Sequence, residues 1–366
     1  MKKIIVVFGT RPEAIKTCPL ILKLKQNKNL KCIVCLSGQH REMLSQVMDV
    51  FHVEADYNLD IMTERQSLGD ITTKVLNGFD EILAVEKPDI VLVHGDTTTS
   101  FAAALSAFYR GIAVGHVEAG LRTYNMDNPF PEEFNRHAVD LISKVFFAPT
   151  LKAQENLLRE GVDESRIFVT GNTVIDAMRF TINDNFEDEN SKWAKDSKLI
   201  LLTTHRRENW GLPMKHIFEA VRRLVYDHDE IKVIFPIHKN PDIQKLAYDF
   251  FGSCERIRII DSVDAVVFHN YMSKAFFLMT DSGGVQEEAT SIGKPVLVLR
   301  NDTERPEGID TGTLRLVGTD EDDIYNLAKR LIEDEKLYNS MSIPSSIYGD
   351  GHASEKICSI IEKIEV

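Results

Sequence analysis

Short apolar segments alternate with longer segments of helical periodicity along the whole chain. In the first half the strand-like segments are KIIVVF, KCIVCLS, DIVLVHG, IAVGHVE, VFFAPT and RIFVTG. The series restarts with KLILLTT, IKVIFPIH, RIRIID, AFFLMTD and PVLVLR. Strands that alternate with helices form βαβ units, so the pattern predicts an α/β fold with parallel sheets.

The segment 182–198, INDNFEDENSKWAKDSK, lies between the two series. It is polar, acidic and poor in strand-forming residues, so we interpret it as a linker. A chain of 366 residues is long enough for two domains. We therefore predict two Rossmann-like domains, at 1–181 and 199–351.

Composition narrows the classes of function. The net charge of −13 argues against a general nucleic-acid binder, which needs a basic surface. No apolar run reaches the roughly 18 residues of a membrane span, and the N-terminus enters a strand pattern without a signal peptide. The five cysteines are then expected to be reduced thiols of a cytoplasmic protein. Cys32 and Cys35 should point to opposite faces of one strand, which favours burial over metal or redox chemistry.

Unusual polar residues gather where the predicted strands end. Ligands of parallel α/β sheets bind beyond the carboxyl ends of the strands, so these residues predict a cleft between the two domains. They are Arg11, Lys16, Gln39, His40, His94, Asp96, His116, Glu118, His205, Arg206, His238, Asp281 to Gly284, and Arg305. The first such turn holds one glycine, Gly9, where a dinucleotide-binding turn would continue G-x-G-x-x-G.

Two stretches of the second half favour an anionic ligand. In TDSGGVQEEA, residues 280–289, a serine and two glycines open a helix whose N–H groups would bind an anion. Glu288 follows Gly284 by one turn and would suit ribose hydroxyls; the alternative is a plain turn capped by Ser282. In TTHRREN, His205 and Arg206 favour phosphate binding, the alternative being a solvated basic turn.

VHGDTTTS and GHVEAGLRT each place a histidine and a carboxylate two residues apart. General acid–base catalysis by Asp96 and Glu118 is one interpretation. A metal site is another, although each pair offers only two ligands. Asp96 would alternatively cap the following helix. In NPFPEEFNRH, Glu132 and Glu133 fall in the first turn of a helix, where the helix dipole stabilises carboxylates in any case. Glu132 is a candidate functional residue only together with Asp96 and Glu118.

Taken together, GTRPEAIK, GQHREML, HGDTTTS, GHVEAGLRT, PFPEEFNR, GNTVIDA, THRREN, DSGGVQEEA and RPEGIDTGT resemble the non-hydrolysing UDP-N-acetylglucosamine 2-epimerases. The resemblance runs from residue 2 to about residue 360 in the family's order. It implies a two-domain fold of the glycosyltransferase B kind, with the final helix, about 352–366, packing back on the first domain. It also implies a homodimer that needs no metal and no nicotinamide cofactor.

The resemblance assigns site residues by motif. Catalytic roles fall on Asp96, Glu118, Glu132 and His205, and substrate-binding roles on Arg11 and Lys16. Contacts to UDP fall on Ser282, Gly283, Gly284 and Glu288, and Arg305 faces the substrate. Some members of the family are activated by a second UDP-N-acetylglucosamine. The matching positions are Gln39, Glu42, Arg65, Arg206 and His238, and Glu42 stands where activated members often have Gln.

The resemblance implies elimination of UDP to 2-acetamidoglucal and re-addition to give UDP-N-acetylmannosamine. The alternatives are the same chemistry on a modified sugar, a hydrolysing epimerase, a glycosyltransferase with an acceptor, and a non-catalytic nucleotide-sugar sensor. A metal hydrolase using His94, Asp96, His116 and Glu118 is a further alternative. Products of the family feed the synthesis of capsule, teichoic acid or common antigen.

Overall fold

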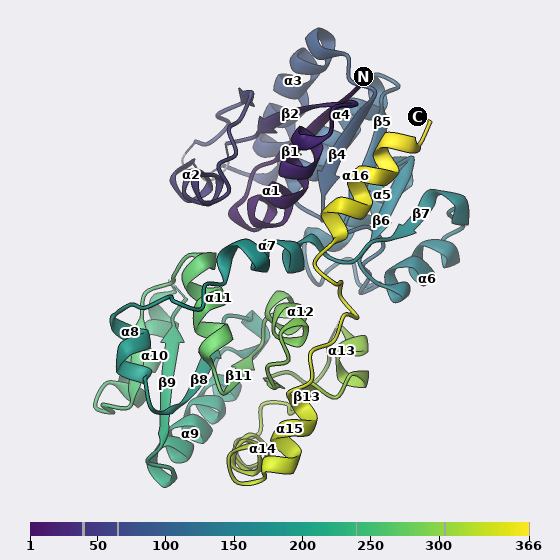
Figure 1. Ribbon diagram of the computed structural model, residues 1–366. Coiled ribbons are helices and arrows are strands. Elements are labelled where there is room, and N and C mark those ends of the chain that lie inside the picture. The colour runs from purple at the N-terminus through teal and green to yellow at the C-terminus, as the bar shows by residue number, and fades with distance from the viewer. Residues whose placement is uncertain (39–40, 64–65, 239, 304, 366) are drawn as a thin grey trace. The chain divides into compact units, whose positions relative to one another are not determined.

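The chain forms two compact units in the computed structural model, each built on a parallel sheet with helices on both faces (Figure 1). The structure describes residues 1–38, 41–63, 66–238, 240–303 and 305–365, except for the side chains of 41–43 and 207. The first unit comprises Met1–Phe180 and Tyr348–Val366, and the second comprises Thr181–Ile347. The predicted α/β class with two parallel sheets is confirmed.

The sheet of the first unit has, in the described residues, the strand order β3-β2-β1-β4-β5-β6-β7. Its strands are β1 (Lys2–Phe8), β2 (Leu30–Leu36), β3 (Tyr57–Asn58), β4 (Ile90–His94), β5 (Ala113–Val117), β6 (Val145–Ala148) and β7 (Ile167–Val169). Its helices are α1 (Arg11–Gln26), α2 (Arg41–Val50), α3 (Leu68–Glu86), α4 (Thr98–Tyr109), α5 (Glu132–Ile142), α6 (Leu151–Arg159), α7 (Thr173–Thr181), the 3₁₀ turn η1 (Glu164–Arg166) and α16 (Ala353–Lys363).

The sheet of the second unit has, over the part that is described, the order β10-β9-β8-β11-β12-β13. Its strands are β8 (Lys198–Thr203), β9 (Ile231–Pro236), β10 (Ile257–Ile260), β11 (Phe277–Thr280), β12 (Val296–Val298) and β13 (Leu314–Leu316). Its helices are α8 (Glu189–Ala194), η2 (Arg207–Asn209), α9 (Leu212–Asp227), α10 (Pro241–Phe251), α11 (Ala265–Lys274), α12 (Gly283–Ser291), α13 (Pro306–Asp310), α14 (Glu321–Glu333) and α15 (Glu335–Met341).

Both faces of the first sheet are buried, which explains why its strands read as continuous apolar runs. Successive side chains of β1 alternate between two cores: Ile4 packs with α1 and α16, whereas Ile5 packs with α3 and α4. Cys32 and Cys35 on β2 divide in the same way, one against each core. The two side chains therefore point to opposite faces of the strand, as the pattern predicts.

The C-terminal helix α16 lies beside α1 in the first unit (Figure 1). Ile357 and Ile361 of α16 are fully buried in the same core as Cys18 and Ile21 of α1. The segment that precedes α16 also belongs to this unit, since Asn172 N–H donates to the carbonyl of Tyr348 at 2.7 Å. Residues 348–351, which the sequence analysis assigns to the second domain, therefore pack in the first unit.

The segment 182–198, interpreted from its composition as a linker, lies in the second unit and contains α8. Asp188 caps α8 and accepts a hydrogen bond from the hydroxyl of Tyr271. Trp193 is covered by the cationic groups of Lys232 and Arg258, 5.0 and 4.6 Å from its ring centre. A polar segment can thus be fixed by caps and cation–π contacts that hydropathy does not reveal.

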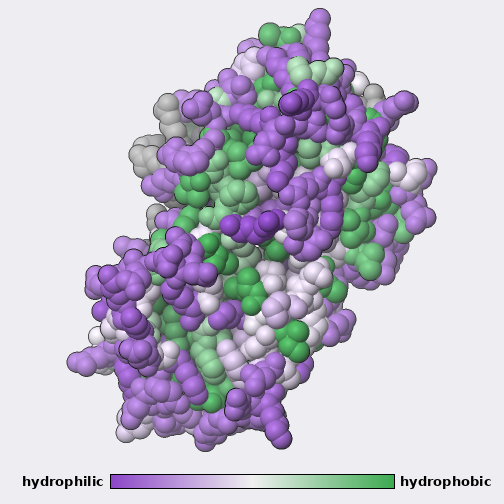
Figure 2. Space-filling view, in the orientation of Figure 1, coloured by the Kyte–Doolittle hydropathy of each residue, from purple (hydrophilic) through white to green (hydrophobic). Residues whose placement is uncertain are grey.

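One face of the molecule shows apolar side chains interspersed with hydrophilic ones (Figure 2). Within the described residues, no helix is both long and apolar enough to cross a membrane.

Candidate functional site

Each sheet has one position where the strand order reverses. In the first sheet it lies between β1 and β4, and in the second between β8 and β11. Ligands of doubly wound sheets bind beyond the carboxyl ends of the strands at such a position. The turns after these four strands therefore define the candidate site of each unit.

The turn after β1 needs a glycine because a side chain at this position would collide with its neighbours. A Cβ on Gly9 would lie 1.9 Å from Oγ of Ser37, at the end of β2. Thr10 then caps α1 and makes a capping box with Glu13. This cap fixes the start of the helix that carries Arg11 and Lys16.

Glu13 is a buried carboxylate that the sequence analysis missed. Its Oε2 accepts hydrogen bonds from the backbone N–H groups of Gly9 and Thr10, at 3.1 and 2.8 Å. Its Oε1 accepts from the hydroxyls of Thr97 and Ser100, at 2.7 and 3.1 Å. Burial raises the pKa of Glu13 despite these bonds. One carboxylate thus joins the turn after β1 to the start of α4; the spacing Thr-x-x-Glu was the available signal.

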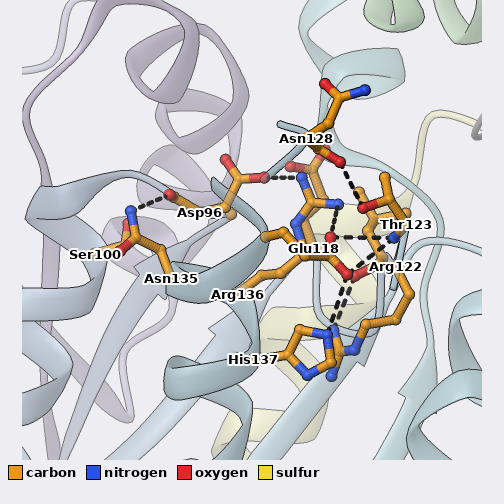
Figure 3. Close-up of polar contacts among 12 residues, drawn as sticks. Asp96, Ser100, Glu118, Arg122, Thr123, Asn128, Asn135, Arg136 and His137 are labelled. Carbon is orange, nitrogen blue, oxygen red and sulfur yellow. Dashed lines mark hydrogen bonds and ion pairs between the residues drawn. The ribbon is translucent and has the colours of Figure 1, made fainter. Parts of the chain in front are cut away.

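Asp96 follows β4 and is held by two residues of α5 (Figure 3). Its Oδ2 lies 2.5 Å from Nη2 of Arg136, and its backbone carbonyl accepts from Nδ2 of Asn135 at 2.8 Å. The helix α4 is capped by Thr97, whose side chain accepts from the N–H of Ser100. The alternative that Asp96 caps this helix is therefore wrong.

Glu118 follows β5 with a positive φ of 68°. Its Oε1 pairs with Nζ of Lys16 and accepts from Nδ2 of Asn172 at 2.8 Å. A Cβ on Gly95 would lie 3.1 Å from Oε2 of Glu118, so this carboxylate lies against the turn that carries Asp96. Lys16, Glu118 and the turn of Asp96 are therefore neighbours, because the strand order places β1, β4 and β5 side by side.

His94 lies 3.9 Å from Glu118, measured from Nδ1 to Oε2. Burial lowers the pKa of His94 to about 3, although the Glu118 carboxylate acts in the opposite direction. His94 is therefore a neutral imidazole at neutral pH.

The adjacent residues Glu132 and Glu133 have different environments at the start of α5. The Glu133 side chain is fully buried and accepts from the N–H groups of Thr123 and Tyr124, at 3.0 and 2.7 Å. Burial raises the pKa of Glu133, but these bonds and Arg136 outweigh it and lower the value. Glu133 thus anchors the preceding loop, whereas Glu132 is only partly buried.

The histidines and carboxylates of HGD and HVE do not gather around one point. The ring of His116 is directed to Asp140 and to the carbonyl of Gly95. Among the described residues, no group of three or more His, Cys, Asp and Glu could hold a metal ion.

In the second unit the loop after β8 is organised around Asp281, which is buried. The backbone N–H groups of His205 and Arg206 donate to this carboxylate, both at 3.0 Å. Nδ2 of Asn209 also donates to Asp281 at 3.0 Å and to the carbonyl of Leu299 at 3.1 Å. Asp281 and Asn209 therefore position the loop, a role that only the folded chain reveals.

His205 lies beside a second histidine. Its ring stacks on that of His238, with 6.5 Å between centroids. Loss of solvation lowers the pKa of His205, and the cations nearby add to this, while Asp281 opposes it. The lowered pKa therefore favours the neutral form of the His205 ring.

The helix α12 begins directly after β11 and has no side-chain cap. Ser282 is the N-cap residue, but its hydroxyl makes no capping hydrogen bond, so the alternative that it caps the helix is wrong. The carboxylate of Glu288 folds back toward this end, since a Cβ on Gly284 would lie 3.8 Å from its Oε1. Oε2 of Glu288 is 3.5 Å from Nε2 of His269. The uncapped turn at Gly283 and the Glu288 carboxylate thus occupy the same end of α12.

Arg305 precedes α13 and is fixed by a buried acid. Its Nε lies 2.6 Å from Oε1 of Glu287, whose side chain is 3% exposed. The guanidinium is therefore held against the first carboxylate of the QEE sequence, on α12.

The positions that match an activator site are described only in part. Gln39 and Arg65 lie outside the described residues, as does the side chain of Glu42, whose backbone belongs to α2. Arg206 follows β8, and His238 is exposed after β9.

Comparison with known proteins extends these observations. Residues 22–362 match the family model of UDP-N-acetylglucosamine 2-epimerase. A UDP-N-acetylglucosamine 2-epimerase of Bacillus subtilis is 52% identical over 355 residues, which are 97% of this chain and 93% of the relative.

Two solved structures are similar over nearly the whole chain. MnaA of S. aureus, determined with UDP, has a TM-score of 0.91 and 50% identity, covering 99% of this chain and 96% of that one. UDP-N-acetylglucosamine 2-epimerase from Neisseria meningitidis, bound to UDP-N-acetylglucosamine, has a TM-score of 0.91 and 44% identity, covering 99% and 100%.

Proposed function

Because the chain belongs to the UDP-N-acetylglucosamine 2-epimerase family, we propose that it interconverts UDP-N-acetylglucosamine and UDP-N-acetylmannosamine. The relatives that carry this name match almost the whole chain, and two similar structures hold UDP or UDP-N-acetylglucosamine. In the structure, the observation that supports the proposal most directly is the Lys16–Glu118 pair beside the turn of Asp96.

The reaction inverts C2 of the sugar, a carbon whose proton is not acidic. The C2 proton of the sugar has no neighbouring ketone, so elimination is the available path without redox chemistry. A base takes the C2 proton, the C1–O bond breaks, and UDP leaves with the bonding electrons. The resulting 2-acetamidoglucal accepts UDP again at C1, and an acid protonates C2 on the opposite face.

The first unit supplies the acid–base groups in this proposal. Asp96, Glu118 and Glu132 are the carboxylates available to the two proton transfers and to the positive charge that develops on the sugar ring. Lys16 and Arg11 stabilise negative charge on the leaving diphosphate. The Lys16–Glu118 pair holds the cation and the carboxylate next to each other before the substrate binds.

The second unit supplies the nucleotide contacts. The N–H groups of Gly283 and Gly284 at the start of α12 would bind a phosphate, because the side chain of the N-cap residue Ser282 does not cap them. The N–H of Ser282 donates to the Thr280 hydroxyl at 3.0 Å, so Ser282 would contact UDP through its own hydroxyl. The Glu288 carboxylate at the same end would accept hydrogen bonds from ribose hydroxyls. His205 and Arg305 would stabilise the diphosphate as it leaves.

The family resemblance supports further parts of the proposal. The enzyme acts in the cytoplasm as a homodimer, without metal or nicotinamide, and its product feeds cell-surface polysaccharide synthesis. UDP-N-acetylglucosamine also acts as an activator, through Gln39, Glu42, Arg65, Arg206 and His238. The carboxylate of Glu42 would oppose a second diphosphate electrostatically, so activation is expected to be weak.

Proton NMR of the purified protein with UDP-N-acetylglucosamine in D₂O tests the proposal. UDP-N-acetylmannosamine with deuterium at C2 is the expected product. Free N-acetylmannosamine and UDP would indicate a hydrolysing enzyme instead. If neither exchange nor product appears, even with UDP-N-acetylglucosamine in excess, the result would favour a modified sugar as the substrate.

A further inference from the structure

A buried ionisable pair lies behind Asp96 and takes no part in the proposed chemistry. His116 on β5 is fully buried, and its Nδ1 lies 2.5 Å from Oδ1 of Asp140 on α5. Its Nε2 lies 2.8 Å from the backbone carbonyl oxygen of Gly95, the residue before Asp96. The ring therefore connects α5 to the turn that carries a proposed catalytic carboxylate.

Both ring nitrogens of His116 face groups that only accept hydrogen bonds. A carboxylate and a backbone carbonyl have no proton to donate, so each nitrogen must carry one for both bonds to exist. His116 is then an imidazolium. A neutral ring would place a lone pair against one of the two oxygens.

The surroundings balance the charge of this imidazolium. Oδ2 of Asp140 lies 2.7 Å from Nη2 of Arg122, and Arg122 makes two parallel bonds to Glu160, at 2.7 and 2.6 Å. Burial raises the pKa of Asp140, but the two cations outweigh it and lower the value. The charges thus alternate along the contacts from His116 to Asp140, Arg122 and Glu160. A buried cation requires such neighbouring opposite charges.

The turn of Asp96 is held through successive backbone groups. The N–H of Gly95 donates to the carbonyl of Val117 at 2.9 Å, and its own carbonyl accepts from His116. The carbonyl of Asp96 accepts from Asn135. Gly95 has a positive φ of 62°, a conformation from which the peptide could rotate if its carbonyl were released.

We propose that His116 is a positioning residue for Asp96, acting as an imidazolium that Asp140 orients and that holds the Gly95 carbonyl. This inference rests on the proposed function, in which Asp96 takes part in the chemistry.

Two substitutions separate the two bonds of the ring. The amide nitrogen of asparagine falls near the position of Nδ1, so His116→Asn can keep the bond to Asp140 and loses the bond to Gly95. The amide nitrogen of glutamine falls near Nε2, so His116→Gln can keep the bond to Gly95 and loses the bond to Asp140.

We expect His116→Asn to lower kcat by about 10- to 100-fold with KM within about threefold, because a small displacement of a catalytic group has this effect. We expect His116→Gln to retain more of kcat than His116→Asn. His116→Asn should be at least as stable as His116→Gln, since it keeps the bond to the charged Asp140. If His116 had only a structural role, the kcat values of the two variants would follow their stabilities. The proposal predicts opposite orders, with His116→Asn at least as stable as His116→Gln but lower in kcat.

Glu160→Gln is the matched control, because it alters the far end of the same charge run and does not contact His116. It should keep wild-type kcat. Equal kcat in His116→Asn and Glu160→Gln would overturn the proposal. Absence of epimerisation by the wild type would instead overturn the proposed function.

A second measurement needs neither activity nor a variant. In wild-type protein labelled with ¹⁵N-histidine, NMR at neutral pH should show a buried ring protonated on both nitrogens, with slow exchange of both protons. A spectrum without such a ring would show that His116 cannot donate to both Asp140 and the Gly95 carbonyl, and it would overturn the inference.

Discussion

Lys16 and Glu118 form an ion pair across 102 residues of sequence, and the Glu118 side chain is only 8% exposed. The pair joins the first helix of the chain to the turn after β5. It places a cation and a carboxylate next to each other at the carboxyl edge of the sheet, where the two opposite charges of an elimination would develop.

Replacement of the carboxylates by amides tests their roles one at a time. Asp96→Asn, Glu118→Gln and Glu132→Gln should each lower kcat by about 10²-fold or more, because a proton transfer loses its donor or acceptor. UDP binding, measured by calorimetry, should stay within about threefold of the wild type. Turnover similar to that of the wild type in any one variant removes that residue from the catalytic set.

Glu132 and Glu133 offer a matched comparison of neighbouring residues. Glu133→Gln should lower the free energy of unfolding by about 1–3 kcal/mol, because Glu133 accepts from two backbone N–H groups and pairs with Arg136 inside the protein. Glu132→Gln should leave stability nearly unchanged. Urea unfolding of both variants provides the measurement, and the reverse order would contradict these assignments.

Glu288→Ala tests the nucleotide contact. The carboxylate lies at the N-terminal end of α12, and hydrogen bonds to a charged group contribute about 1.5–3 kcal/mol. The affinity for UDP should therefore fall by about 10- to 100-fold. An unchanged dissociation constant would show that Glu288 does not contact the ribose.

Gly284→Ala tests the approach of a phosphate to the backbone of α12. The added Cβ meets no atom closer than Oε1 of Glu288 at 3.8 Å, so the free protein should fold normally or gain up to about 1 kcal/mol in helix propensity. UDP binding should weaken by about tenfold or more if a phosphate contacts this turn. Wild-type affinity for UDP in this variant would argue against a phosphate at Gly284.

His94 should contribute to acid sensitivity. In the unfolded chain its pKa is about 6.5, whereas burial lowers the folded value to about 3. Between these pH values the unfolded state binds a proton that the folded state does not, so stability falls as the pH drops through this range.

His94→Asn lacks this titration and supplies the control. Urea unfolding at pH 7 and pH 5 should show a smaller loss of stability in the variant than in the wild type. An equal loss in both proteins would mean that His94 does not titrate on unfolding.

Local patterns gave most of the strands but missed two. β3 is only two residues long, and β13 has three residues with one apolar pair. Such segments are too short for a periodic signal and become strands only by pairing with β2 and β12. The segment 182–198 shows the converse, because its polar composition conceals the helix α8 and its contacts to Tyr271.

The sequence by itself determined the class of fold and the sites at the strand ends. Hydrophobic periodicity is a local property, and the carboxyl ends of parallel strands share one edge of a sheet, so Lys16, Asp96 and Glu118 were identifiable before the structure. The tertiary structure alone decided the strand order, the burial of Glu133 rather than Glu132, and the roles of Glu13, Asp281 and His116. These three side chains act through hydrogen bonds to residues distant in sequence, and only the packing of the folded chain specifies such partners.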